Sequence, residues 1–397
     1  MSGQPSETTH QKGIHHRISE FEFRDPDYQQ IVVWAHNWGT TPKNIIDVVF
    51  NRDLSKISDG HIVALNLDAL GITKLDLSRV TKLQRLSCTN NNLTELDLSM
   101  VPDLRKLWCD GNRLTKLDLS PVPNLQKLFC HDNKLIELDL SPVSELNEIG
   151  LKGNQLTELD LSSLSNLKKL KCTSNRLTEL DLSPVPALEA LACNWNQLAE
   201  LDLSPVPKLY KFFCHGNRLT EIDLSPLTTL RELGCSGNLL TELDLYPVPN
   251  LQRLKCSENQ LTNLDLSSTP LLRWLSCDGN NLTSLDLSTL SNLQELACNG
   301  NKLTELNLTS TPNLKLLLCG ENLLTDLDLS KLPDLVWLDC TGNELSEIDL
   351  TKAVKLEKLL CQNNKITELN IQQQRKLASL HVDPQVTITN GSDFSIG

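Results

Sequence analysis

Cysteine is the residue type in this chain that can do the most kinds of chemistry, because a thiol can form a disulfide, bind a metal ion or act as a nucleophile. The chain has 13 cysteines among 397 residues. They are spaced by 21 residues, except for one interval of 42 whose midpoint is Leu151. The series is Cys88, Cys109, Cys130, Cys172, Cys193, Cys214, Cys235, Cys256, Cys277, Cys298, Cys319, Cys340 and Cys361. Such regularity indicates a structural repeat rather than one reactive site.

The spacing of the cysteines argues against both disulfide formation and metal binding. Residues stacked on neighbouring strands lie about 4.8 Å apart and parallel, whereas a disulfide needs Cβ atoms about 3.8 Å apart and a specific torsion angle. A straight row of thiols cannot surround a tetrahedral zinc ion, and no C-x₂-C pair occurs. Leu151 indicates that an apolar side chain can fill the same position. We therefore expect buried, reduced thiols, no metal, no cofactor and a reducing compartment.

An asparagine stands three residues after every position of this series, from Asn91 to Asn364. Leucines recur at fixed places around it, so that each unit has the pattern L-x-x-L-x-C-x-x-N-x-L-T-x-L-D-L-S. First positions run from Ile62 to Leu377 in steps of 21, which gives 16 units. A fixed period of this length predicts a solenoid, in which each unit packs on its neighbours.

The repeat also predicts the elements of each unit. The alternation at residues 86–88 predicts a short strand with Leu86 and Cys88 pointing inward, and stacked strands would form one parallel sheet. Leu96 and Leu98 alternate again and would close the core from the other side. The Pro-rich links leave no room for a full helix, so we expect short extended or 3₁₀ segments there. The asparagine amide should bond the backbone of its own and neighbouring turns, because a buried amide needs partners.

The motif L-x-x-L-x-C-x-x-N-x-L resembles the leucine-rich repeat (LRR). The 21-residue period with a cysteine at the sixth position is similar to the cysteine-ladder LRRs of bacterial surface proteins of the internalin-J type. This resemblance covers about residues 62–382. It implies an α/β-type solenoid, a horseshoe with a parallel β-sheet on its concave face and about 16 repeats, and a bacterial origin. The function of such a protein would depend on the side chains at the variable positions, which the solenoid exposes.

The two ends of the chain differ from the repeats. The N-terminal residues are polar and lack the apolar segment of a secretory signal. Asp25-Pro26-Asp27 predicts the start of a helix, residues 39–42 a break, and Pro42 to Phe50 a second short helix. Helices here would cover the open end of the core. We expect a disordered tail (1–20), a helical cap (21–61), the solenoid (62–382) and a C-terminal cap or tail (383–397).

The variable positions of the strands are the candidates for function. Positions three, five and seven of each unit would point outward on the concave sheet, and several of the scarce aromatic residues lie on or beside them. Exposed aromatic residues near Lys or Arg are the usual anchors of protein interfaces. We expect the centre of the face between Trp108 and Phe213. The candidate partner-binding residues are Trp108, Phe129, His131, Lys169, Lys171, Trp195, Tyr210, Lys211, Phe213, His215, Trp274 and Trp337.

Charge gives a second pattern on the same face. Position three holds seven basic and three acidic residues in the fourteen regular units, although the net charge of the chain is −13. A surface chosen for solubility explains this stripe equally well, as it does the Asp row at position fifteen. The net charge disfavours nucleic-acid or membrane binding driven by the whole protein. RNA or another anionic ligand on the basic stripe stays an alternative, which strong salt dependence would support.

Catalysis is not indicated by any motif. The chain has no Gly-rich phosphate loop, no H-E-x-x-H and no Ser/His/Asp arrangement, and the cysteines are assigned to the core. No apolar run reaches 18 residues, so we expect no transmembrane helix. We expect a non-catalytic, cytoplasmic, monomeric protein–protein interaction module that binds its partner on the concave sheet. The alternatives are a bacterial surface adhesin and a secreted effector that binds a host protein.

Overall fold

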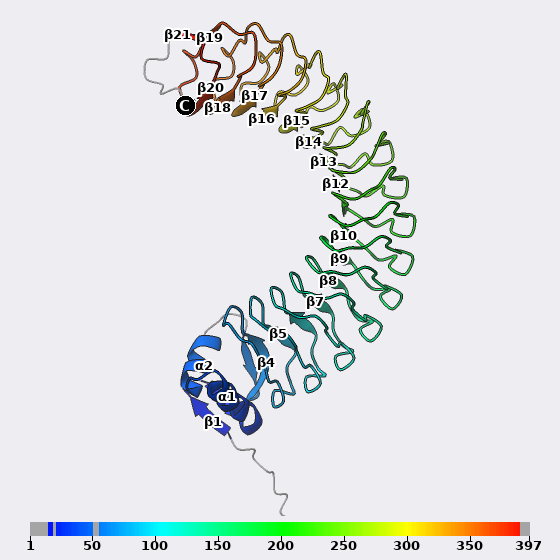
Figure 1. Cartoon of the computed structure of the whole chain (residues 1–397), viewed down its shortest axis with the longest axis vertical. Helices are drawn as coiled ribbons and strands as arrows, with labels where there is room; N and C mark the ends of the chain where they lie inside the picture. Colours follow the sequence, from blue (N-terminus) through cyan, green and yellow to red (C-terminus); the bar gives the residue numbers. More distant parts are fainter. Residues whose placement is uncertain (1–14, 19–20, 51–54, 390–397) are drawn as a thin grey trace, which may run out of the picture. The chain divides into compact units, whose positions relative to one another are not determined.

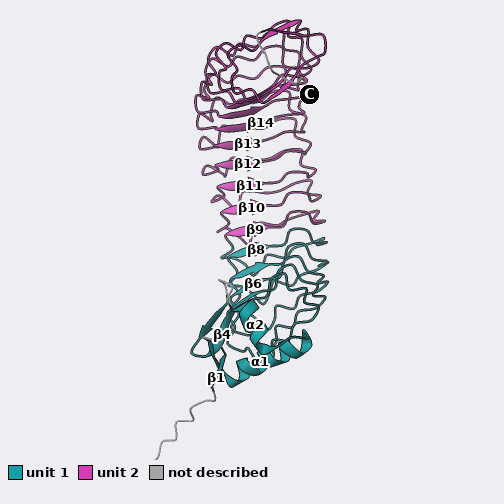
Figure 2. Ribbon diagram, turned by 90° about the vertical axis from the view of Figure 1, so that its left-hand side faces the viewer, with its two compact units in different colours: residues 1–167 teal, residues 168–397 magenta. Residues whose placement is uncertain are grey.

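The structure, a computed structural model, describes residues 15–18, 21–50 and 55–389. The chain divides into two compact units, unit 1 (residues 1–167) and unit 2 (residues 168–397), which have different colours in Figure 2. Figure 1 labels the helices and strands along the chain. Each unit contains successive 21-residue rungs, and each rung contributes one short strand to a parallel sheet. The repeat therefore sets the architecture, as the sequence predicted.

Unit 1 begins with a small α/β cap. β1 (His15–Ile18) pairs antiparallel with β2 (Phe21–Arg24), and α1 (Asp25–Asn37) and α2 (Pro42–Val49) follow. The two helices confirm the sequence prediction. β1, however, lies inside the segment expected to be a disordered tail, and that expectation was wrong for residues 15–18. Pairing with β2 and the contact of His16 Nε2 with Asp25 Oδ1 at 2.7 Å order this strand. The rest of the expected tail, 1–14 and 19–20, lies outside the described residues.

The cap is joined to the first rungs by buried polar contacts as well as by apolar packing. Trp34 is fully buried, and its indole Nε1 donates to the carbonyl of Asp76 at 2.7 Å. Asp27, also buried, accepts from the backbone N–H of Ile62 and contacts His61 Nδ1, each at 2.9 Å. These contacts satisfy polar groups at the end of the core, where no preceding rung can do so.

The sheet of unit 1 starts with an antiparallel pair and continues in parallel. β3 (Lys56–Ser58) pairs with β4 (His61–Asn66), with an irregularity between Lys56 and Ile57. From β4 onward, each strand pairs with the next in a strict register of 21 residues. The following strands of this unit are β5 (Arg85–Ser87), β6 (Lys106–Trp108), β7 (Lys127–Phe129) and β8 (Glu148–Gly150).

Unit 2 continues the same pattern. β9 to β18, and then β20, pair in parallel order with the same register. A second, two-stranded parallel sheet forms near the C-terminus from β19 and β21. The strands are β9 (Lys169–Lys171), β10 (Ala190–Ala192), β11 (Lys211–Phe213), β12 (Glu232–Gly234), β13 (Arg253–Lys255), β14 (Trp274–Ser276), β15 (Glu295–Ala297), β16 (Leu316–Leu318), β17 (Trp337–Asp339), β18 (Lys358–Leu360), β19 (Glu368–Asn370), β20 (Ser379–His381) and β21 (Thr387–Thr389).

The core of each rung is closed by residues from both alternating segments. Leu86 and Cys88 are fully buried on the inner side of the strand, and Leu96 and Leu98 are buried opposite them. The link to the next rung consists of consecutive turns, in which Val101 N–H bonds the Leu98 carbonyl at 3.1 Å. All 13 cysteines are buried, and Cys109 Sγ lies 3.5 Å from the carbonyl of Phe129. The thiols thus behave as small core side chains, as predicted.

The asparagines form a continuous ladder beside the cysteines. Asn112 Nδ2 donates to the carbonyls of Cys88 and Cys109 at 2.9 and 3.1 Å, and its Oδ1 accepts from Leu93 N–H at 3.0 Å. One side chain thus bonds its own rung and the preceding rung. Asn112 is buried, and the same contacts recur along both units, so the predicted role of the asparagine is confirmed.

Candidate protein-binding surface

The outward positions of the strands form one face of the sheet in each unit, here called the strand face. Side chains at positions three and five are mostly half-exposed, whereas those at position four are buried. In Figure 1 the strands of unit 2 lie along the inner side of its curved stack. A partner on the strand face would therefore meet side chains that a stiff, hydrogen-bonded backbone holds at regular spacing.

Unit 1 contains three of the predicted site residues, and they lie together. Trp108 on β6 and Phe129 on β7 are neighbours in the sheet register, with parallel rings whose centroids are 6.1 Å apart. The ring of His131, just after β7, lies 5.8 Å from that of Phe129. All three side chains are half-exposed. The structure thus forms an aromatic row that runs across two rungs.

Unit 2 contains a larger group around β11. Tyr210, Lys211, Phe213 and His215 lie on one rung, where Lys211 Nζ is 5.8 Å from the Tyr210 ring centre and the rings of Phe213 and His215 are 6.1 Å apart. The Trp195 ring covers Gly216, because a Cβ added there would lie only 2.3 Å from Trp195 Cε3. Trp195 is 63% exposed, and it follows β10 on the preceding rung.

The other predicted residues of unit 2 lie farther away. Lys169 and Lys171 are on β9, two strands from β11, and Trp274 on β14 is three strands away, or about 14 Å at ordinary strand spacing. Trp337 on β17 is about 29 Å from β11 and has its own partner, Lys358, whose Nζ lies 4.1 Å from the ring centre. Trp337 is therefore not part of the β11 group.

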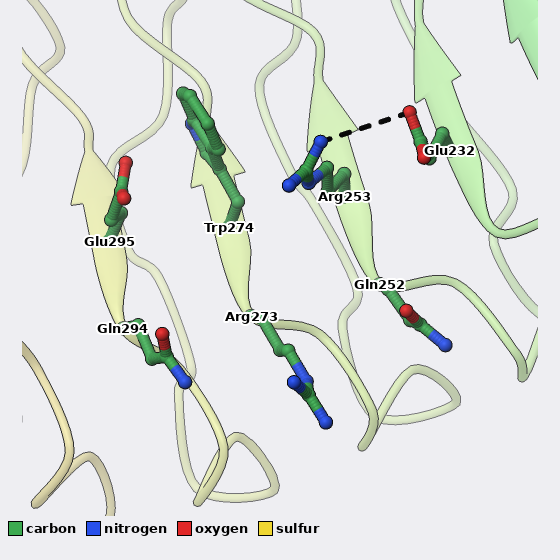
Figure 3. A pocket seen from close by; sticks show the side chains of 7 residues that line it. All are labelled: Glu232, Gln252, Arg253, Arg273, Trp274, Gln294 and Glu295. Atoms are coloured by element: carbon green, nitrogen blue, oxygen red, sulfur yellow. Dashed lines mark ion pairs between the residues drawn. The ribbon is translucent and has the colours of Figure 1, made fainter.

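A shallow depression lies between β12 and β15 (Figure 3). Its volume is about 280 Å³. Trp274 stands on its strand between Arg253 and Glu295, and Arg253 Nη1 lies 4.0 Å from Glu232 Oε2. Lys255 Nζ is 4.6 Å from the Trp274 ring centre. The lining residues are Glu232, Gln252, Arg253, Arg273, Trp274, Gln294 and Glu295.

The basic stripe at position three is partly neutralised. Lys127 Nζ lies 2.7 Å from Glu148 Oε2, and Lys211 Nζ lies 2.9 Å from Glu232 Oε1, in both cases on the next rung. The Asp row at position fifteen is structural, because Asp97 Oδ1 accepts from the backbone N–H of Ser99 at 2.9 Å and its equivalents do the same. The stripe is thus a line of alternating charges for part of its length, which weakens its attraction for a polyanion.

The ionisation of the site follows from burial. Desolvation raises the pKa of every cysteine thiol, that of Cys172 to about 12, so these thiols stay protonated and unreactive. Burial, and then the charge of Lys255, lowers the pKa of His215, which favours the neutral imidazole. Among residues 15–18, 21–50 and 55–389, no three His, Cys, Asp or Glu side chains converge as a metal site. No helix in that part of the chain is long and apolar enough to cross a membrane.

Several residues of this surface were not found from the sequence. Glu148, Glu232 and Arg253 are among the charged residues of position three, but they were not named as candidates for binding, and neither were Lys255 and Arg273. Gly150 and Gly234 were also missed, although each supports an aromatic cluster. A comparison of units four repeats apart could have found them, because Lys-x-Phe-x-His on one rung is followed by Glu-x-Gly on the next in both places.

The fold has relatives among solved structures. The functional domain of InlJ from Listeria monocytogenes, which includes a cysteine ladder, is 36% identical to the chain, with a TM-score of 0.75 over 77% of this chain and 68% of that one. The chain belongs to the cysteine-ladder leucine-rich repeat family. In this LRR protein, the family fold accounts for the rungs, the buried thiols and the asparagine ladder together.

Two further structures are similar to this LRR protein. An LRR protein of Leptospira interrogans is 27% identical, with a TM-score of 0.76 over 82% of this chain and 91% of that one. YopM, a leucine-rich effector protein from Yersinia pestis, is 27% identical, with a TM-score of 0.61 over 82% and 87% of the two chains. No family model matches the chain, and no curated protein sequence matches it either.

Proposed function

We propose that this LRR protein is a non-catalytic interaction module that binds a protein partner through its strand face. The observation that carries the proposal is Trp195, a large aromatic side chain that is 63% exposed on a backbone of unfavourable conformation. The likeness to YopM, a leucine-rich effector protein, is consistent with a binding role. The buried, protonated thiols support the non-catalytic part of the proposal.

The backbone at Trp195 has a φ of 54°, in the left-handed region that glycine adopts most readily. The same position has a positive φ in every regular unit. It holds glycine in half of these units and Asn, Asp, Ser or Glu in all the others but one, so that Trp195 is the one bulky aromatic residue there. A bulky residue here costs about 1–2 kcal/mol relative to the ordinary conformation. Strained positions persist where function requires the side chain, so Trp195 is the strongest candidate for a partner anchor.

Other side chains around Trp195 fit an interface. Phe213 and His215 supply apolar area one rung away, while Lys211 and Arg253 supply charge at its margin. Exposed aromatic residues at the centre of a patch are typical hot spots of protein interfaces. We place the partner on this part of unit 2 and treat Trp108, Phe129 and His131 in unit 1 as a second contact region.

The free thiols support a proposal for the cellular location. We propose that the protein works as a monomer. We also propose a reducing compartment such as the cytoplasm, because all 13 cysteines are free and proteins of oxidising compartments more often pair theirs. An effector delivered into another cell would meet the same reducing conditions. A surface adhesin is the alternative that this reasoning favours least.

Affinity capture with matched variants tests the proposal. Trp195→Asn keeps a residue that tolerates the left-handed turn, so we expect an unchanged or slightly higher unfolding temperature and loss of the captured partner. The control is Tyr246→Ala, which removes an 81% exposed aromatic residue from a link between β12 and β13, outside the strand face. Equal capture by wild type and Trp195→Asn would refute the placement of the interface.

A further inference from the structure

One aromatic cluster of the strand face occurs twice in the chain. Lys127, Phe129 and His131 are followed on the next rung by Glu148 and Gly150. The same residue types recur at Lys211, Phe213, His215, Glu232 and Gly234, each 84 residues later, which is four repeat lengths. We call these the first cluster, in unit 1, and the second cluster, in unit 2. Core packing does not explain why these five residues recur, because all five lie on outward positions or in the following turn.

The two clusters have the same internal geometry. The Lys–Glu ion pair measures 2.7 Å in the first cluster and 2.9 Å in the second. His131 Nδ1 accepts from the backbone N–H of Lys152 at 2.9 Å, and His215 Nδ1 accepts from that of Ser236 at 3.0 Å. Each histidine ring is therefore fixed across the next turn of the chain. Five matched residues with matched contacts indicate a built arrangement rather than random surface variation.

The glycines explain how the rings can lie across the next strand. A Cβ added to Gly150 would lie 2.3 Å from His131 Cε1 and 2.7 Å from Phe129 Cδ1. At Gly234 the corresponding atoms are His215 Cε1 at 2.5 Å and Phe213 Cδ1 at 2.7 Å, and His215 Nε2 is nearer still, at 2.2 Å. In all the remaining regular units, the residue at position five has a Cβ, for example Ala192. The backbone thus omits a side chain only where a Phe and a His ring occupy its place.

The histidine of the second cluster presents a hydrogen-bond donor. Because Nδ1 accepts a backbone N–H, the proton of the neutral imidazole is on Nε2. His215 Nε2 has no hydrogen-bond partner within the described parts of the chain. Lys255, two rungs farther along, is close enough to lower the pKa of His215. A donor beside a cation and above an aromatic ring suits a carboxylate that is attached to an apolar group.

The charge around the second cluster favours an acidic occupant. Lys211, Arg253 and Lys255 together exceed Glu232 by two positive charges, on a protein whose net charge is −13. We infer that the second cluster is a binding site for an acidic linear segment of a protein partner. An apolar residue of the segment packs on the Phe ring, and a neighbouring carboxylate meets the His and the Lys or Arg side chains. In the first cluster the carboxylate of Asp110 accepts from His131 N–H, where the neutral amide of Asn194 stands in the second cluster, so the two clusters differ in charge. This inference rests on the proposed function and specifies the partner.

The test uses the full chain and a library of random linear 12-residue peptides. Peptides selected on wild type, and depleted on the Phe129→Ala/Phe213→Ala variant, should contain Asp or Glu next to an apolar residue. Titration calorimetry with one such synthetic peptide should give one equivalent per chain. Gly234→Ala should remove this binding, because the added Cβ displaces the rings, whereas Gly150→Ala, which makes the same change in the first cluster, should leave it intact. Ser276→Ala is the matched control, since its position-five side chain lies outside both clusters.

The outcomes separate this inference from the proposed function. Unchanged binding in Gly234→Ala, loss of binding in Gly150→Ala, or selected peptides without acidic residues would overturn it. An amide version of the peptide, with Asn or Gln in place of Asp or Glu, should bind at least tenfold more weakly. Displacement of the peptide by poly(U) with comparable affinity would also overturn it in favour of a nucleic-acid ligand. The proposed function itself fails only if Trp195→Asn captures its partner normally.

Discussion

Asn196→Ala tests the hydrogen-bond ladder that holds the rungs of this LRR protein together. Asn196 is buried, with 8% of its surface exposed, and its Oδ1 accepts from Leu177 N–H at 3.1 Å. Its Nδ2 donates to the carbonyls of Cys172 and Cys193 at 3.1 and 3.0 Å. The substitution removes these three bonds, together with a longer one from Nδ2 to the Asn194 carbonyl at 3.3 Å, and leaves space between neighbouring rungs.

The three lost bonds do not cost the same. The Cys172 carbonyl keeps a donor from Asn175, and the Cys193 carbonyl keeps one from Asn217. Only the N–H of Leu177, a fully buried residue, loses its partner entirely. An unsatisfied buried group costs about 1–3 kcal/mol, and each weakened acceptor adds about 0.5 kcal/mol. We therefore expect the free energy of unfolding to fall by about 2–4 kcal/mol.

Urea denaturation measures the total, and hydrogen exchange measures the local effect. The amide of Leu177 should exchange at least tenfold faster in the variant, while that of Leu261, which bonds Asn280 four rungs away, should change much less. The control is Asn250→Ala, an exposed asparagine whose side chain bonds the Thr228 carbonyl, with an expected change within about 0.5 kcal/mol. A loss below about 1 kcal/mol with protected Leu177 would refute the reasoning, because it would mean that the ladder is replaceable by solvent.

Three other predictions concern ionisable groups. The cysteines should resist alkylation in the native protein and all react after denaturation, because burial raises the pKa of thiols such as Cys172; native labelling of several sites, read by mass spectrometry, would contradict this. The turn hydrogen bonds lower the pKa of Asp118 and its equivalents, so their stabilisation is present above about pH 4 and is lost as pH falls through the lowered pKa; Asp118→Asn should reduce this acid sensitivity in denaturation at pH 3 and 6. Lys255→Gln should raise the pKa of His215 in an NMR titration, since one cause of its lowering is removed; an unchanged pKa would exclude that contact.

The repeat made most of the fold predictable. The series of cysteines and asparagines predicted the strands, the buried positions and the asparagine ladder, because every rung packs the same side chains in the same way. A strand at residues 15–18 was missed, since a four-residue polar segment such as β1 has no periodicity and depends on its pairing with β2. The alternation of apolar and polar residues could not show that the links between rungs are turns. Local backbone hydrogen bonds decide between turns and 3₁₀ segments.

The candidate site was predictable only in part. Outward aromatic residues could be named from their position in the unit, and Phe213 and His215 do lie together. Their contacts depend on the length and rotamer of side chains on the next rung, which periodicity does not encode. Trp337 illustrates this limit, because it occupies the same position as Trp274 but packs with Lys358. That the residues of both units serve one partner stays a prediction.

The shared carbonyls of the cysteine ladder also determine the order in which the rungs should unfold under an applied force. In the interior of unit 2, a carbonyl such as that of Cys193 receives amides from two successive rungs, whereas in the described residues that of Cys361 receives only Asn364. A force applied at the C-terminus should therefore peel the solenoid from that end, one rung after another. Each step would release 21 residues, or about 70 Å of extended chain, and an optical trap would record a staircase of equal extensions rather than one rupture.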